Sequence, residues 1–132
     1  MDNNQQFSVT VEKDGAGLPE SFSLAKAIYS ILDHKNGEDI AVMRVGEKTD
    51  IADFFALCTA QSNTHVKALT DEVEYQLEKI EIKADRVEGR GSDNSWMVMD
   101  YGRVIVHIFS REMREFYNLD KLYSDTEKVN LD

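Results

Sequence analysis

The chain has 132 residues, of which 42% are apolar and 30% are charged, a mixture typical of one globular domain. Aspartate and glutamate number 25 against 15 lysine and arginine residues, so the formal net charge is −10. This acidity argues against extensive contacts with nucleic-acid phosphates and against docking on an anionic membrane surface, and it suits a basic protein partner. The single cysteine, Cys58, excludes an internal disulfide and a cysteine-based zinc site.

The two ends of the chain differ from its middle. Neither a bilayer-spanning apolar run nor the apolar core of a signal peptide occurs, so we expect a soluble, cytoplasmic protein. Polar sequence with two glycines and the only proline indicates a flexible N-terminal extension over residues 1–20. An apolar–polar alternation within residues 7–11 leaves a short strand as the alternative there. Residues 125–132 resemble this polar segment and are interpreted as a C-terminal tail, which leaves one domain over residues 21–124.

The domain opens with an amphipathic helix followed by two strands. Apolar residues recur at helical spacing at Leu24, Ile28, Ile31 and Leu32. Ser21 or Ser23 can cap this helix, and Asn36-Gly37 can end it. The apolar runs 39–45 and 54–60 predict strands, and because neither alternates cleanly, we expect both to be buried on two faces.

The clearest element is a second amphipathic helix over residues 62–81, with Ser62 as its N-cap. Its apolar stripe consists of Val66, Leu69, Val73, Leu77 and Ile80. A third strand over 82–88 and a turn-rich loop over 89–94 follow.

Two further strands, 95–100 and 103–109, precede a short helix over 111–117 and a last segment over 119–123. The order helix, two strands, helix, three strands, helix predicts an α/β fold. We expect a mixed β-sheet of about five strands flanked by helices, in a single domain.

The last two predicted strands form a hairpin whose faces can be assigned. A two-residue turn at Tyr101-Gly102 places Asp100 opposite Arg103 and Trp96 opposite His107. One face is wholly apolar and should belong to the core: Met97, Met99, Val104, Val106 and Ile108. The other face is mixed: Trp96, Val98, Asp100, Arg103, Ile105 and His107.

Two interpretations of the mixed face stay open on these residues alone. In the first, Trp96 is a partly buried packing residue and His107 is its hydrogen-bonded neighbour. In the second, Trp96 is the exposed anchor of a protein interface, because tryptophan framed by polar residues is a frequent hot spot. Asp100 and Arg103 would then be charges on the rim of that interface.

No catalytic or metal-binding constellation emerges from the sequence. His34, His65 and His107 lie on different predicted elements without a second ligand at metal spacing, and the HExxH and glycine-rich phosphate-binding patterns are absent. Cys58 lies within an apolar strand, which is typical of a buried cysteine rather than a nucleophile. We therefore expect no catalytic residues, no metal and no cofactor, so the chain is predicted not to be an enzyme.

Several sequence blocks occur in continuous order over about residues 22–124. In and after the hairpin they are Glu88-Gly89, Trp96, Asp100-Tyr101-Gly102, Val106-His107-Ile108-Phe109 and Arg114-Glu115-Phe116-Tyr117-Asn118-Leu119. Upstream they are Asp53-Phe54-Phe55 and Thr59-Ala60-Gln61-Ser62-Asn63-Thr64-His65-Val66. Together these blocks resemble the signature of the ribosomal silencing factor family, also called Iojap-like.

This resemblance implies a nucleotidyltransferase-like topology without that enzymatic activity. Members of the family bind the large ribosomal subunit through ribosomal protein fourteen, at the face where the small subunit docks. The implied function is translational repression, in which the bound factor sterically blocks subunit joining, chiefly when nutrients are scarce. We expect little direct RNA contact, because the chain is acidic.

The same resemblance places the contact surface on the hairpin. The implied partner-binding residues are Trp96, Met99, Asp100, Tyr101, Gly102, Arg103, Val104 and His107. In the family an acidic residue commonly follows the hairpin glycine, whereas this chain has Arg103 there. An exposed aromatic patch on this hairpin could also pair with itself about a two-fold axis, so a homodimer of the free protein is a further hypothesis.

The alternative function is a nucleotide-binding or nucleotidyltransferase-like enzyme on the same fold. Such an enzyme needs a phosphate cradle, and the one candidate is the run Gly89-Arg90-Gly91-Ser92. The same run is also typical of a plain turn.

Overall fold

A computed structural model describes residues 7–90 and 93–131, which form one β-sheet with helices on both faces. The helices are α1 (Ser21–His34), α2 (Asn63–Glu78), α3 (Arg111–Tyr117) and α4 (Leu119–Leu122). The strands are β1 (Glu38–Arg44), β2 (Phe54–Ala60), β3 (Arg86–Arg90), β4 (Trp96–Asp100), β5 (Val104–Ser110) and β6 (Glu127–Val129). The sheet has six strands in the order β3-β4-β5-β2-β1-β6.

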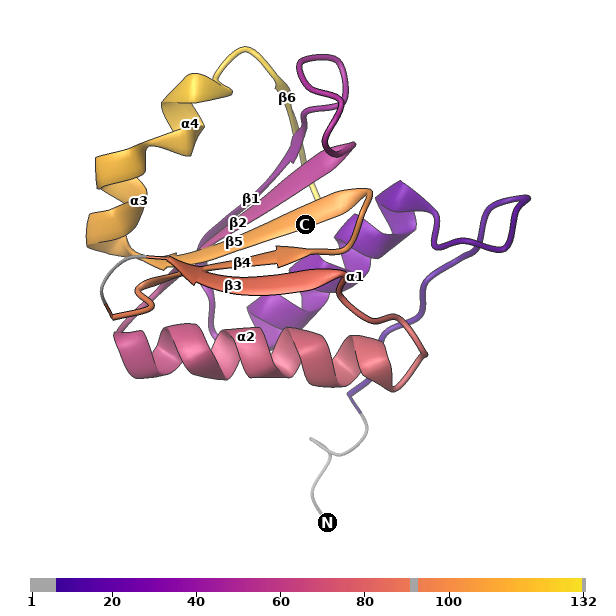
Figure 1. Cartoon of the computed structure of the whole chain (residues 1–132), viewed down its shortest axis with the longest axis horizontal. Helices are drawn as coiled ribbons and strands as arrows, with labels where there is room; N and C mark the ends of the chain where they lie inside the picture. Colours follow the sequence, from indigo (N-terminus) through magenta and orange to yellow (C-terminus); the bar gives the residue numbers. More distant parts are fainter. Residues whose placement is uncertain (1–6, 91–92, 132) are drawn as a thin grey trace.

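The centre of the sheet is the parallel pair β2 and β5, and the other neighbouring strands are antiparallel. Figure 1 shows α1 and α2 lying along one face, while α3 and α4 stand over one end of the other face. Every residue of β2 is buried, because side chains on both of its faces are covered. The predicted mixed α/β sheet flanked by helices is therefore confirmed, with six strands in place of about five.

The long helices begin and end largely where the sequence predicts. Ser62 caps α2, since its Oγ accepts the backbone N–H of His65 at 3.1 Å. The cap of α1 is Glu20 rather than Ser21 or Ser23, because the Glu20 carboxylate accepts the N–H groups of Phe22 and Ser23. At its other end α1 stops as predicted: Asn36 takes a left-handed conformation with φ 65°, and the Gly37 N–H donates to the Leu32 carbonyl at 2.8 Å.

Both terminal segments contribute to the packed body. Val9 is buried in the core, and the Phe7 ring stacks on His34 with 3.8 Å between ring centroids. The alternative strand over residues 7–11 does not form. Within described residues 7–20, an isolated bridge joins Lys13 to Pro19. The predicted C-terminal tail contains β6, which pairs with β1. Residues 1–6 and 132 lie outside the described residues.

The third predicted strand is displaced toward the C-terminus. Glu81 takes a left-handed conformation with φ 65°, and the Ile82 N–H donates to the Leu77 carbonyl. These residues therefore form the C-terminal cap of α2 and are not part of a strand. β3 therefore begins at Arg86 and includes Gly89 and Arg90, which the sequence had placed in a loop. Residues 91–92 of that predicted loop lie outside the described residues.

The hairpin between β4 and β5 has the predicted faces but a different register. Asp100 pairs with Ile105, and Trp96 pairs with Phe109. The turn residues are Gly102 and Arg103 rather than Tyr101 and Gly102, because Gly102 takes φ 85° at the first turn position, as in a type II′ turn. This change shifts the partners by two residues, so every strand residue keeps its face. The predicted core residues Met99, Val104, Val106 and Ile108 are fully buried.

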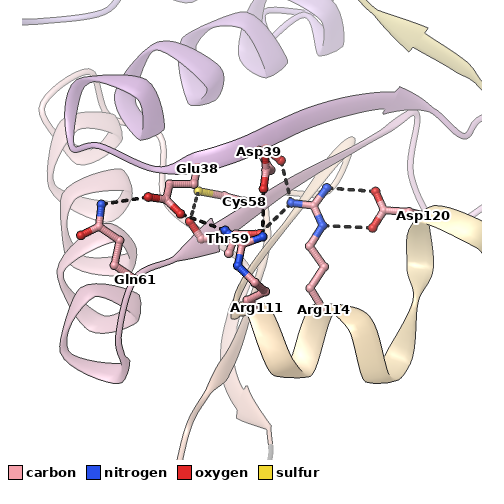
Figure 2. A network of polar contacts seen from close by, with 8 residues as sticks. All are labelled: Glu38, Asp39, Cys58, Thr59, Gln61, Arg111, Arg114 and Asp120. Atoms are coloured by element: carbon pink, nitrogen blue, oxygen red, sulfur yellow. Dashed lines mark hydrogen bonds and ion pairs between the residues drawn. The ribbon is translucent and has the colours of Figure 1, made fainter.

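Arg114 of α3 connects the C-terminal helices to the sheet (Figure 2). Its guanidinium donates two hydrogen bonds, of 2.9 and 3.0 Å, to the Asp120 carboxylate. The same group donates to the Asp39 carbonyl at 2.6 Å and to the Thr59 hydroxyl at 2.9 Å. The hydrogen bonds from Arg114 hold the pKa of Asp120 below its usual range. One side chain thus joins α3, α4, β1 and β2.

We expect Arg114→Ala to lower the free energy of unfolding by about 2 kcal/mol, because it leaves the Asp120 carboxylate, the partly buried Thr59 hydroxyl and the Asp39 carbonyl without their donor. Urea unfolding measures this loss. Arg111→Ala is the matched control. Arg111 lies on the same helix as Arg114 and pairs with Glu38 and Asp39 of β1, but it is largely exposed, so its loss should cost less than about 1 kcal/mol. Equal losses in the two variants would contradict this assignment.

Candidate functional site

Trp96 lies inside a cluster of aromatic rings on the sheet face that α3 and α4 partly cover. This surface is called the aromatic face below, and its rings are those of Phe55, Trp96, His107, Phe109 and Tyr117. Its side chain is only 6% exposed. The ring of Tyr117 from α3 lies 4.5 Å from the indole, and that of Phe109 lies at 5.7 Å, measured between centroids. The Arg90 guanidinium sits over the indole at 5.4 Å. The expectation of an exposed tryptophan anchor is therefore wrong for this conformation, because the α3 aromatic covers it.

His107 is the buried polar partner of Trp96, as the packing interpretation of the mixed face predicts. The indole Nε1–H donates to His107 Nδ1 at 3.2 Å, so the neutral imidazole carries its proton on Nε2. Within the described residues Nε2 is buried without a hydrogen-bond partner, and the Phe55 ring packs at 4.8 Å. Burial, with a smaller contribution from Arg90, lowers the pKa of His107 to about 4. The ring is therefore neutral at pH 7.

Three other predicted contact residues face the opposite side of the sheet. Met99, Tyr101 and Val104 are buried in the core beneath α1 and α2. Burial raises the pKa of Tyr101, and the nearby carboxylates of Glu74 and Glu78 add to this effect. These three side chains shape the strands of the hairpin and do not reach its outer surface.

The predicted contact residues that remain accessible gather at the hairpin tip, defined here as Asp100, Gly102 and Arg103. Gly102 is exposed, and Asp100 and Arg103 are partly exposed. The Asp100 carboxylate accepts the Gly102 N–H at 2.8 Å, which fixes the turn. Arg103 points to the N-terminal segment, where its Nη2 lies 2.9 Å from an oxygen of Asp14. The tip and the half-buried Met97 and Val98 of β4 are the accessible parts of the hairpin.

Exposed apolar side chains on α3 and α4 escaped the sequence analysis. Phe116 is 77% exposed, its ring meets Tyr117 edge to face, and Leu122 is also exposed. The available signal was the composition of residues 116–123, which hold more aromatic and leucine residues than one face of so short a helix can bury. These side chains extend the accessible apolar surface outward from Trp96.

The candidate metal ligands and the cysteine can be located within residues 7–90 and 93–131. No group of three His, Cys, Asp or Glu side chains there is arranged to hold a metal ion. Cys58 is fully buried, as predicted, and burial raises the pKa of its thiol to about 12, which keeps it protonated and inert.

No helix within the described part of the chain is long and apolar enough to cross a membrane.

Trp96→Ala should lower the free energy of unfolding by about 3–5 kcal/mol, because it empties a buried aromatic site and removes the donor to His107. Trp96 is the only tryptophan, so its fluorescence in the wild type reports directly on this site. Acrylamide should quench the folded protein far less than the urea-unfolded chain. Equal quenching in both states would contradict the burial.

The free energy of unfolding should also depend on pH, because the pKa of His107 differs between the folded and unfolded states. Its pKa of about 4 in the folded state lies below the value near 6.5 of an exposed histidine, so the unfolded chain binds more protons between these values. This contribution to stability is complete above about pH 6.5 and is lost as the pH falls toward 4. Between pH 7 and pH 5 the loss should be about 2 kcal/mol in urea unfolding.

The control for this pH dependence is His107→Gln, which retains an acceptor for the Trp96 indole but does not titrate. Its free energy of unfolding should change less than that of the wild type over the same interval. Parallel pH profiles for the two proteins would show that another group is responsible.

Comparison with known proteins gives the family. The family described as "Ribosomal silencing factor during starvation" matches residues 19–132. The chain is 32% identical over 110 residues to ribosomal silencing factor RsfS of Bacillus subtilis, covering 83% of this chain and 92% of the relative. It is 27% identical over 100 residues to the mouse protein named mitochondrial assembly of ribosomal large subunit protein 1, covering 74% of this chain and 43% of the relative.

A solved structure is similar as well. The fold matches a crystal structure of a Chromobacterium violaceum protein with a TM-score of 0.75 and 26% identity, over 80% of this chain and 87% of the other. The residues matched by the family model include the hairpin, α3 and β6. The chain therefore belongs to the ribosomal silencing factor family.

Proposed function

We propose that this protein represses translation by binding the large ribosomal subunit and keeping the small subunit from joining it. The observation that carries the proposal is the family match over residues 19–132, since relatives in this family are named as ribosomal silencing factors. The mouse relative is named for assembly of the large ribosomal subunit, which supports the same choice of subunit.

The proposed partner on the large subunit is ribosomal protein fourteen, at the face where the small subunit docks. A net charge of −10 favours encounter with a basic ribosomal protein and disfavours burial against ribosomal RNA. The mechanism is steric: a body of this size on the joining surface needs only to remain bound. A micromolar dissociation constant, roughly −8 kcal/mol, already permits this at cellular protein concentrations.

The proposed contact surface is the hairpin tip together with the accessible part of the aromatic face. Asp100, Gly102 and Arg103 present backbone and charge at the tip. Trp96 and His107 support this surface indirectly. Their hydrogen bond fixes β4 against β5, so the hairpin is already ordered before binding and little entropy is lost. Repression chiefly under nutrient limitation, and cytoplasmic action, are part of the same proposal.

The proposal involves no catalysis or cofactor. The nucleotide-handling alternative gains no support from the described residues, because Gly89 and Arg90 of the suggested phosphate cradle are strand residues paired with β4. A homodimer of the free protein through the hairpin would use the same surface and would therefore compete with the ribosome.

Sedimentation of purified large and small subunits in magnesium, with and without the protein, tests the proposal. We expect the protein to migrate with the large subunit and the fraction of joined ribosomes to fall. Protein that stays at the top of the gradient while joining is unchanged would overturn it.

A charge-reversing variant locates the contact surface. Asp100→Lys at the tip should weaken binding to the large subunit tenfold or more, equivalent to about 1.4 kcal/mol, because it places a cation against a basic partner. Asp33→Lys makes the same change in net charge on an exposed position of α1 and should bind like the wild type. Urea unfolding of both variants controls for folding. Equal affinities for the two variants would exclude the tip.

A further inference from the structure

The chain before residue 19, which the family match does not include, reaches the hairpin tip. An Asp14 carboxylate oxygen lies 2.9 Å from Arg103 Nη2, and the two side chains are 24% and 42% exposed. The loop that carries Asp14 and the turn between β4 and β5 emerge at the same side of the molecule (Figure 1). The ion pair therefore connects the N-terminal segment to the proposed contact surface.

The loop that presents Asp14 is closed by its own hydrogen bonds. The second oxygen of Asp14 accepts the N–H groups of Ala16 at 2.8 Å and Leu18 at 3.0 Å, and the Asp14 N–H donates to the Leu18 carbonyl. Gly17 takes φ 81°, which the turn requires. These backbone hydrogen bonds, with a smaller contribution from Arg103, hold the pKa of Asp14 below its usual range. Asp14 is thus a fixed, ionised carboxylate.

Hydrogen bonds connect the two ends of this loop to each other and to α1. The Glu12 N–H donates to Ser23 Oγ at 2.8 Å, and the Glu20 N–H donates to the Glu12 carbonyl at 2.8 Å. Loop and tip together border a hollow of about 340 Å³, with Leu18, Leu24 and Ile82 among its walls. The surface beside the tip is therefore continuous from the N-terminal loop to Arg103.

We infer that residues 13–19 form part of the ribosome-binding surface and that Asp14 sets the charge of the hairpin tip toward a basic protein partner. This inference rests on the proposed function. The tip itself carries one negative charge, on Asp100, and one positive charge, on Arg103, so the adjacent Asp14 carboxylate makes the local charge negative. Charges at the rim of an interface act mainly on the association rate and on its salt dependence.

Asp14→Asn is the sharpest test, because the asparagine oxygen can still accept the loop hydrogen bonds while the charge disappears. We expect the association rate constant for purified large subunits to fall about three- to tenfold at low salt, with a smaller difference at high salt. Arg103→Ala should raise the same rate constant. The double variant restores the net charge of the tip and should return close to the wild type.

The matched control is Asp71→Asn, which removes one carboxylate from the ion pair with Lys67 on α2. It should leave the association rate unchanged. If Asp14→Asn behaves like this control, or binds faster than the wild type, the inference is wrong although the proposed function stands. If the wild type itself does not bind large subunits, the proposed function fails and the inference fails with it.

Discussion

The guanidinium of Arg114 joins two short C-terminal helices to the middle of the sheet, and the covering of the aromatic face depends on that connection. α3 and α4 bury no residue completely, so their own apolar contacts fix them weakly. Arg114 supplies what the helices lack: a bidentate pair with Asp120 and hydrogen bonds to Asp39 and Thr59 (Figure 2). With α3 held in place, Tyr117 covers Trp96, and Trp96 donates a hydrogen bond to His107, whose burial keeps the ring neutral.

This arrangement separates stability from recognition within one hairpin. The middle of β4 and β5 is buried on the core face and largely closed on the aromatic face, so its residues stabilise the fold. Accessible polar groups are left mainly at the tip, where Asp100 and Gly102 form the turn and Arg103 meets Asp14. The proposed association with a basic protein uses this rigid tip on an acidic body.

Much of the fold could be predicted because the signals are local. The helical stripe beginning at Val66, the Ser62 cap and the apolar run of β2 each specify an element through neighbours in sequence. The hairpin faces were also predictable, since alternation assigns each residue to a side. The register was not, because Tyr101-Gly102 and Gly102-Arg103 both read as two-residue turns, and the φ of 85° at Gly102 selects the second.

The sequence by itself thus determined the α/β class, the order of the central elements, the buried Cys58 and, through resemblance, the family. Only the tertiary structure decided that Trp96 is covered, that residues 127–129 extend the sheet, and that Asp14 sits at the hairpin tip. The physical reason is the sequence separation between the residues that make contact. Elements follow from contacts a few residues apart, whereas Arg114 to Thr59 and Asp14 to Arg103 join groups more than 50 residues apart, whose meeting depends on how the whole sheet is assembled.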